Sequence, residues 1–134
     1  METPFPPDCA ARFRIVRPLA AGGFGSVFLA TQLSLSREAA VKVLHDSALA
    51  EPAQVERFLA EARMTASLNH PNVVRIYDHG AGTGVPWIAY ELLTGETLAT
   101  ALVRRVRFEL DDALGAAAQV AAALEAAHEV GIVH

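Results

Sequence analysis

The sequence predicts an α+β fold with three strands, one helix, two more strands and two closing helices in chain order. Two observations support this prediction. Short apolar runs bounded by glycine or proline occupy much of the first two thirds of the chain and are typical of strands. The last third is rich in alanine and spaces its apolar residues three and four apart, as helices do. At 134 residues and 52% hydrophobic composition, the chain can bury one modest core.

The first three strands are expected at 13–17, 26–31 and 38–44. Residues 13–17 alternate between two faces, and the other two segments are short apolar runs that include β-branched residues. The glycine-rich stretch GGFG at 22–25 then connects the first two strands as a hairpin. Residues 1–11 contain three prolines and little periodicity, so they are expected to form a flexible tail.

A helix is expected next, because the apolar period changes after Pro52. Residues that would share one helix face lie three or four apart, namely Val55, Phe58, Leu59, Ala62 and Ala66. Pro52 suits the helix start, and Pro71 follows its end. Two more strands are expected at 73–77 and 87–93, joined by the glycine-rich linker GAGTGVP.

The last third predicts a short helix over 94–103 and a long helix over 110–130. Asp111 suits the start of the long helix and Gly131 its end. One stripe of this helix is expected to consist of Leu110, Leu114, Ala117, Ala121, Leu124 and His128.

Charge and cysteine content exclude several function classes. A net charge of −4 and a pI near 5.7 give no basic footprint for nucleic acid. The single cysteine, Cys9, cannot close an intramolecular disulfide, which favours the reducing cytoplasm. The segment shows neither a signal peptide nor an apolar run of about 18 residues, so no membrane span is expected within it. A membrane anchor elsewhere in a longer protein stays open.

The glycine turn is the first candidate site. Gly22 and Gly25 lack side chains, so their backbone can approach an anion and direct N–H groups at phosphate oxygens. The alternative, that these glycines only permit a tight hairpin, is equally open from the turn alone. A dinucleotide-binding motif requires a helix after the turn, whereas the run that begins at Val27 favours a strand. The P-loop is absent, because no Gly-Lys-Ser/Thr sequence occurs.

Two charged residues in apolar surroundings are further candidates. Lys42 lies inside a run that should be half-buried, so it must either reach solvent or face a fixed anion. Glu61 lies on the expected helix, close enough to its apolar stripe to face inward. An exposed ion pair contributes only about 0.2–1 kcal/mol, so stability alone would not require the two charges.

The remaining charged residues predict no site of their own. No metal site is expected, because no histidine has paired ligand spacing; the histidines are His45, His70, His79, His128 and His134. Arg104, Arg105 and Arg107 form a short basic run, which we interpret as a solvated face in preference to a substrate-docking surface.

The order of these motifs resembles that of the eukaryotic-like Ser/Thr protein kinases of bacteria. The resemblance begins at Phe13 and extends to His134. The matching stretches in family order are AAGGFGSV at 20–27, AAVK at 39–42, RFLAEA at 57–62, HPNVV at 70–74, IAYEL at 88–92 and GIVH at 131–134. Ala20 departs from the family pattern because it replaces the first glycine of the loop, and weaker nucleotide binding is the most that we expect from it.

The resemblance implies the N-terminal lobe of a kinase, with a five-stranded antiparallel sheet and helix C, followed by helices D and E of an incomplete C-terminal lobe. Residues 12–93 would form the N-terminal lobe with its hinge, and 94–134 the first helices of the next lobe. The sequence would then be a fragment that stops at the His of the family's HRD motif. This family uses ATP with Mg and phosphorylates protein Ser or Thr hydroxyls, so it is a transferase.

The resemblance also implies roles for individual residues. Lys42 would hold the α- and β-phosphates as a catalytic residue, and Glu61 would orient Lys42. The loop over the phosphates would consist of Ala20, Ala21, Gly22, Gly23, Phe24 and Gly25, with Phe24 at its tip.

The adenine would lie against small apolar side chains. By resemblance, Val27 and Ala40 would cover the ring from above. Glu91 and Leu93 would offer hinge backbone groups to its edge, and Tyr90 would stand behind it in the gatekeeper position. The segment alone is expected to be inactive, because in this family the catalytic Asp and the metal ligands follow the GIVH stretch.

Two other functions stay open from the sequence. A pseudokinase or regulatory nucleotide-binding module is supported only by Ala20, whereas Lys42 and Glu61 favour an enzyme. A structural α+β domain that binds no nucleotide is the third possibility.

Overall fold

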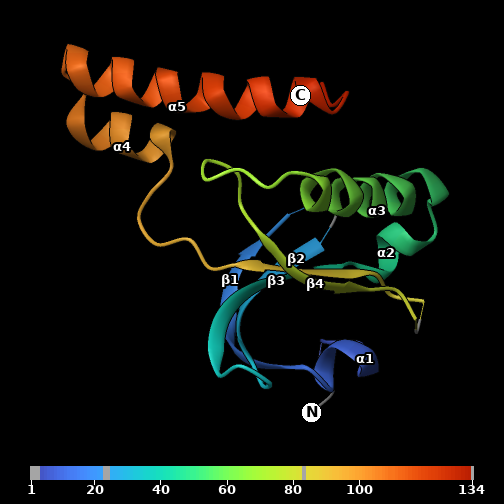
Figure 1. Cartoon of the computed structure of the whole chain (residues 1–134). Helices are drawn as coiled ribbons and strands as arrows, with labels where there is room; N and C mark the ends of the chain where they lie inside the picture. Colours follow the sequence, from blue (N-terminus) through green and yellow to red (C-terminus); the bar gives the residue numbers. More distant parts are fainter. Residues whose placement is uncertain (1–3, 23–24, 83, 134) are drawn as a thin grey trace. The chain divides into compact units, whose positions relative to one another are not determined.

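The computed structural model describes residues 4–22, 25–82 and 84–133 (Figure 1). The chain divides into two units. The first consists of Met1–Ala66 and Val74–Leu92, and the second of Ser67–Val73 and Leu93–His134.

The first unit is built on a five-stranded sheet in the order β1-β2-β3-β5-β4. Every neighbouring pair is antiparallel. The strands are β1 (Phe13–Ala21), β2 (Gly25–Gln32), β3 (Arg37–Leu44), β4 (Ile76–Gly80) and β5 (Trp87–Glu91). This arrangement confirms the predicted α+β class and the five-stranded antiparallel sheet.

Strands β2 and β3 agree with their predicted bounds to within one residue and β5 ends two residues early at Glu91, whereas β1 and β4 differ more. β1 continues to Ala21 through Pro18, which an edge strand tolerates because one side of it needs no partner. β4 begins at Ile76 instead of residue 73, because its pairing runs from Ile76 opposite Tyr90 to Gly80 opposite Trp87. The apolar run at 73–77 therefore only overlaps the start of β4. The pairing with β5 determines where the strand begins and ends.

Among the described residues the first unit contains the helices α1 (Pro7–Ala10), α2 (Asp46–Leu49) and all but the last residue of α3 (Pro52–Ser67). The sequence predicts α3 but neither of the other two, because four residues are too few to show a helical period. Figure 1 shows α3 and α1 on opposite faces of the sheet.

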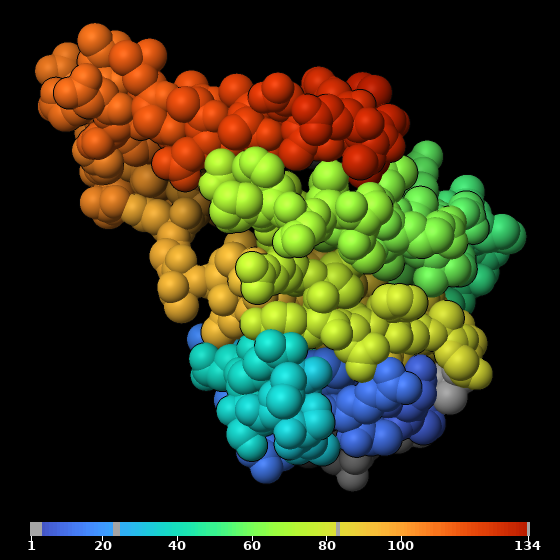
Figure 2. Space-filling model, in the orientation of Figure 1, coloured from blue at the N-terminus to red at the C-terminus, as the bar shows by residue number. Residues whose placement is uncertain are grey.

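Residues 4–11 pack against the sheet, whereas the sequence predicts a flexible tail over 1–11. Phe5 and Cys9 are buried, with 3% and 0% of their surface exposed. The ring of Phe5 meets that of Phe28 edge to face, and Trp87 Nε1 donates to Asp8 Oδ2 at 2.9 Å. In Figure 2 the blue N-terminal residues pack directly against the cyan segment at the β2–β3 turn. The prolines therefore restrict the backbone of this segment to an ordered path, and the buried Phe5 ring and Cys9 thiol hold the segment on the sheet.

Each face of the sheet has its own core. Strand residues alternate between faces, so Val41 and Val43 point one way and Lys42 and Leu44 the other. The face towards α1 packs Phe5, Cys9, Phe13, Ala30, Ala39, Val41, Val43, Trp87 and Ala89. The face towards α3 packs Leu44, Ala48, Phe58, Ala62 and Ile88.

The second unit contains the two predicted closing helices, α4 (Leu98–Arg105) and α5 (Leu110–Glu129). Thr97 caps α4 by accepting a hydrogen bond from the Thr100 N–H at 3.1 Å. After α5, Gly131 has a φ of +82°, and the Ile132 N–H donates to the Ala127 carbonyl at 2.9 Å. The Gly131 N–H also donates to the His128 carbonyl at 3.0 Å. The two bonds form a Schellman ending, in which glycine favours the left-handed position.

Candidate nucleotide-binding site

Lys42 is the single lysine of the chain, and it lies on the face of the sheet that packs against α3. Its strand partners are Val27 on β2 and Ile88 on β5. Lys42 Nζ lies 3.1 Å from Glu61 Oε2, and the two side chains are 27% and 44% exposed. The structure therefore brings together the two charged residues that the sequence singled out.

Packing of α3 positions Glu61. Phe58 and Ala62 are both 4% exposed and hold the helix on the sheet, and Glu61 lies between them in sequence. The Phe58 ring centre is 5.6 Å from Lys42 Nζ, close enough for a weak cation–π contact. An exposed ion pair contributes about 0.2–1 kcal/mol, so the buried side chains, and not this pair, stabilise the helix position.

Tyr90 also contacts the Glu61 carboxylate. Tyr90 Oη donates to Glu61 Oε1 at 2.5 Å. Burial raises the pKa of Tyr90 above its ordinary value, and the hydrogen bond to Glu61 and the charge of that carboxylate raise it further. Glu61 thus joins α3 to β3 through Lys42 and to β5 through Tyr90. This bond is not predictable from the sequence, because the strand pairing and the packing of α3 bring the two residues together.

A small pocket of about 240 Å³ adjoins this pair, and two cationic groups and one carboxylate line it. Its lining consists of Lys42, Leu44, Gln54, Arg57, Phe58 and Glu61. The excess of positive charge suits an anion such as a phosphate group.

The glycine turn connects β1 to β2 as the sequence predicts. Ala20 pairs with Val27 and Ala21 with Ser26, and the Gly22 N–H donates to the Gly25 carbonyl at 2.9 Å. Gly23 and Phe24 lie outside the described residues.

Packing between strands explains why residue 25 is a glycine. A Cβ atom at this position would lie 2.3 Å from the Val43 carbonyl oxygen, whereas one at Gly22 would meet nothing within 4 Å. The close approach of β2 to β3 therefore requires glycine at residue 25 whether or not nucleotide binds, which is a reason separate from both the phosphate and the hairpin explanations.

The predicted adenine-contacting residues occupy the Lys42 face of the sheet. Val27 lies opposite Lys42, and Ala40 lies opposite Tyr90. Directly paired antiparallel residues share a face, so all four lie on the same side. Glu91 follows at the end of β5, where its Oε1 accepts from the Arg75 N–H at 2.9 Å. Leu93 belongs to the second unit and is 69% exposed.

His45, which the sequence suggests only as a candidate metal ligand, forms a hydrogen bond with a serine. Its Nε2 lies 2.7 Å from Ser26 Oγ. This bond joins the end of β3 to the start of β2, next to Gly25. Among the described residues, no group of three or more His, Cys, Asp or Glu side chains gathers to hold a metal ion.

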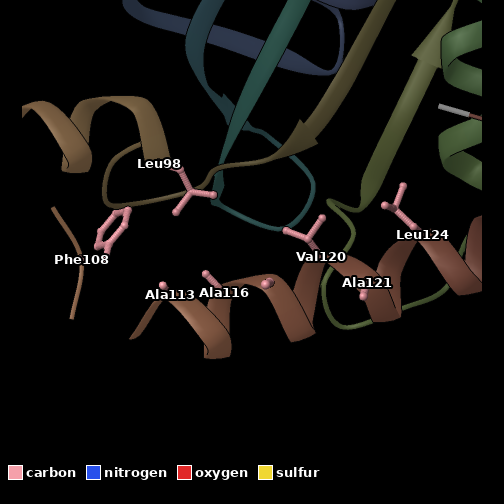
Figure 3. Close-up of a pocket in the computed structure, with 8 residues that line it drawn as sticks. Leu98, Phe108, Ala113, Ala116, Val120, Ala121 and Leu124 are labelled. Carbon is pink, nitrogen blue, oxygen red and sulfur yellow. The ribbon is translucent and has the colours of Figure 1, made fainter. Parts of the chain in front are cut away.

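The second unit offers an apolar groove of about 430 Å³. Figure 3 shows side chains of α5 lining it together with Leu98 and Phe108. The full lining is Leu98, Phe108, Ala113, Ala116, Ala117, Val120, Ala121 and Leu124. The predicted stripe shares Ala117, Ala121 and Leu124 with this lining, but Leu110 and Leu114 are 72% and 58% exposed. The groove is lined by aliphatic and aromatic side chains, so it does not suit a phosphate.

The basic run of the second unit is largely paired within that unit. Arg104 contacts Glu96, and Arg105 NH2 lies 2.8 Å from Asp112 Oδ2. The Arg105 guanidinium also lies 5.0 Å from the centre of the Phe108 ring. These contacts support the interpretation of a solvated face over a docking surface.

No helix in the described part of the chain is long and apolar enough to cross a membrane.

Comparison with known proteins identifies the family. Residues 13–134 match the protein kinase domain. This chain belongs to that family. Serine/threonine-protein kinase PknA of Mycobacterium tuberculosis is 41% identical over 130 residues, which cover 93% of this chain and 30% of the relative. PrkC of Bacillus subtilis is 34% identical over 125 residues, which cover 93% of this chain and 19% of the relative.

Solved structures agree with this family membership. The PknI kinase domain of M. tuberculosis superposes with a TM-score of 0.77 at 28% identity, covering 92% of this chain and 50% of that one. The resemblance to bacterial Ser/Thr kinases, the α+β class and the five-stranded antiparallel sheet are thereby confirmed. The chain spans less than a third of the length of the curated relatives it matches.

Proposed function

We propose that this chain is the nucleotide-binding part of a Ser/Thr protein kinase, which transfers the γ-phosphoryl group of ATP to a protein hydroxyl. The observation that carries the proposal is the 3.1 Å contact between Lys42 Nζ and Glu61 Oε2 in a chain of this family. In this proposal, residues 12–93 form the nucleotide-binding lobe with its hinge. Residues 94–134 form the first helices of the second lobe.

The charged residues would act on the phosphates. Lys42 neutralises the α- and β-phosphate oxygens, and Glu61 keeps the ammonium group pointed at them. Backbone N–H groups of the turn at 20–25 approach the same oxygens, where side chains would obstruct. The pocket beside Lys42 supports this assignment, because Arg57 adds a second positive charge to its lining.

The adenine would lie on the same face of the sheet. Val27 and Ala40 present small apolar side chains to the ring, and Tyr90 limits the depth of the pocket behind it. Backbone groups of Glu91 and Leu93 bond its edge. The common face of Val27, Ala40 and Tyr90 supports this arrangement.

The metal ion would be Mg, which would neutralise charge that develops on the phosphates during transfer. In this family the metal ligands follow the stretch that GIVH matches, so we assign them to residues outside this chain. For the same reason we propose that the 134 residues alone bind nucleotide without turnover. Their coverage of 30% of the PknA relative supports this.

The group that accepts the phosphoryl group is a Ser or Thr hydroxyl of a protein substrate. The expected location of the kinase domain is the cytoplasm.

Thermal unfolding with and without Mg-ATP tests the proposal. Nucleotide that binds only the folded chain raises its melting temperature. We expect this rise for the wild type and its loss in Lys42→Ala. Glu56→Gln is a matched control, because Glu56 forms an exposed ion pair with Arg63 on the same helix; it should keep the full rise. Equal rises in the wild type and Lys42→Ala would contradict the proposal.

A pseudokinase or regulatory module is the alternative, favoured by Ala20 at the first glycine position of the loop. Ala20 is exposed and pairs with Val27, so its extra methyl group is accommodated within the strand pair. Turnover of a generic protein substrate by a longer protein that contains this chain and a complete kinase domain distinguishes the two functions. Binding without turnover in that longer protein would favour the alternative.

A further inference from the structure

The Glu61 carboxylate has a second partner besides Lys42. Its Oε2 lies 3.1 Å from Lys42 Nζ, while its Oε1 accepts the hydroxyl of Tyr90 at 2.5 Å. We propose that Tyr90 is a positioning residue that holds the Glu61 carboxylate against Lys42. This role is additional to the limit that the ring sets on the adenine pocket.

The ion pair alone is a weak restraint on Glu61. The Glu61 side chain is 44% exposed, and exposed carboxylates readily exchange a lysine partner for water. A carboxylate held at one oxygen by a fixed donor can rotate little about its last bond. The other oxygen is then kept in the direction of Lys42 Nζ.

Tyr90 is well placed to be that fixed donor. It lies on β5, which pairs with β3 on one side and β4 on the other. Its neighbours Ile88 and Ala89 are fully buried, and Glu91 N–H donates to the Arg75 carbonyl at 2.9 Å. The hydroxyl is therefore carried by a strand that is hydrogen-bonded to a neighbouring strand on each side.

The protonation state of Tyr90 is compatible with this role. Burial and the adjacent Glu61 carboxylate raise the pKa of Tyr90 above its ordinary value. The phenol therefore keeps its proton throughout the physiological range and always donates to Glu61. Lys42 is itself a residue of the sheet, whereas its partner Glu61 lies on helix α3. Tyr90 therefore restrains the member of the ion pair that the sheet does not carry.

The single lysine allows a direct measurement on the complete 134-residue chain. Incorporation of isotopically labelled lysine gives one side-chain ammonium NMR signal, and it belongs to Lys42. In Tyr90→Phe we expect this signal to shift and its order parameter to fall, because Glu61 is no longer restrained. Glu61→Gln should change the signal at least as much. The double variant should match Glu61→Gln, since Tyr90 acts through Glu61.

Tyr77→Phe is the matched control, because it removes the hydroxyl of the other tyrosine, whose ring lies under the Arg37 guanidinium. It should leave the Lys42 signal unchanged. The backbone spectrum of each variant reports whether the fold is retained. An unchanged Lys42 signal in folded Tyr90→Phe would overturn the proposal. So would an equal change caused by Tyr90→Phe in the presence and absence of Glu61.

A second measurement concerns nucleotide, and this part alone rests on the proposed function. Tyr90→Phe should weaken Mg-ATP binding by about three- to tenfold, the range expected for loss of one hydrogen bond. In Glu61→Gln the same substitution should have no further effect. If the wild type binds no Mg-ATP, the proposed function fails while the NMR result still decides the role of Tyr90. If it binds and Tyr90→Phe binds equally well, positioning by Tyr90 is refuted.

Discussion

Lys42 Nζ and Glu61 Oε2 lie 3.1 Å apart, although one residue belongs to the third strand of the sheet and the other to helix α3. Burial of Phe58 and Ala62 brings the helix to this place. The pair itself adds little to stability because both side chains are partly exposed. In the proposed function, the pair positions the Lys42 ammonium group.

Glu61→Gln should weaken Mg-ATP binding while changing the melting temperature of the nucleotide-free chain little. The amide keeps the size of the side chain but loses the charge that holds Lys42. Isothermal titration calorimetry checks this, and we expect a loss of about tenfold, as for a hydrogen bond to a charged group. Glu56→Gln, which breaks the neighbouring pair with Arg63, should bind normally. Equal losses in both variants would refute a specific role for Glu61.

Gly25→Ala should destabilise the fold by about 1–3 kcal/mol through overpacking. The new Cβ would lie 2.3 Å from the Val43 carbonyl oxygen, and this backbone atom cannot rotate away. Gly22→Ala provides the comparison, because its Cβ would meet nothing within 4 Å. Urea unfolding should show a clear loss for Gly25→Ala and little change for Gly22→Ala. Similar values for both would contradict the close strand packing.

Phe5→Ala should destabilise the chain by about 3 kcal/mol, as expected for removal of a buried aromatic ring. Phe5 is 3% exposed and packs against the ring of Phe28. Val16→Ala is the control, since Val16 is 53% exposed. A flexible N-terminal tail would instead give no loss for Phe5→Ala, so denaturant unfolding distinguishes the two descriptions.

Cys9 should make stability fall at alkaline pH. Burial, followed by the negative charges of Asp8 and Asp78, raises the pKa of Cys9 from 9.0 to about 12. The unfolded chain ionises its thiol first, so this contribution is full below pH 9.0 and is lost towards pH 12. The slope reaches at most about 1.4 kcal/mol per pH unit. Cys9→Ala should show a shallower decline over this window, and identical declines would contradict the burial of the thiol.

The sequence predicts most of the fold because its long periodic segments are unambiguous. Helix α3 follows from the spacing of residues such as Val55 and Phe58, and helix α5 from that of residues such as Ala117 and Ala121. The N-terminal packing is not predictable in this way. Phe5 and Cys9 lie in a proline-rich stretch without periodicity, and their burial depends on the shape of a sheet formed by distant residues.

The candidate site, like the fold, is predictable from the sequence only in part. Lys42 and Glu61 can be selected from local patterns, because each is a charge in an apolar stretch. The bonds of Glu61 to Tyr90 and of Ser26 to His45 cannot, since they depend on strand register and on where α3 packs. Local sequence identifies residue types, and tertiary packing determines which of them meet.

The most direct test of the central claim uses an acyl-phosphate derivative of ATP. Such a reagent transfers its acyl group to an amine held beside the phosphates, forming an amide and releasing ATP. Lys42 is the single lysine, and peptide mapping separates it from the N-terminal amine. We predict acylation of Lys42 that excess Mg-ATP suppresses. Absence of labelling at Lys42, or labelling that excess Mg-ATP leaves unchanged, would contradict the placement of this ammonium group over a bound triphosphate.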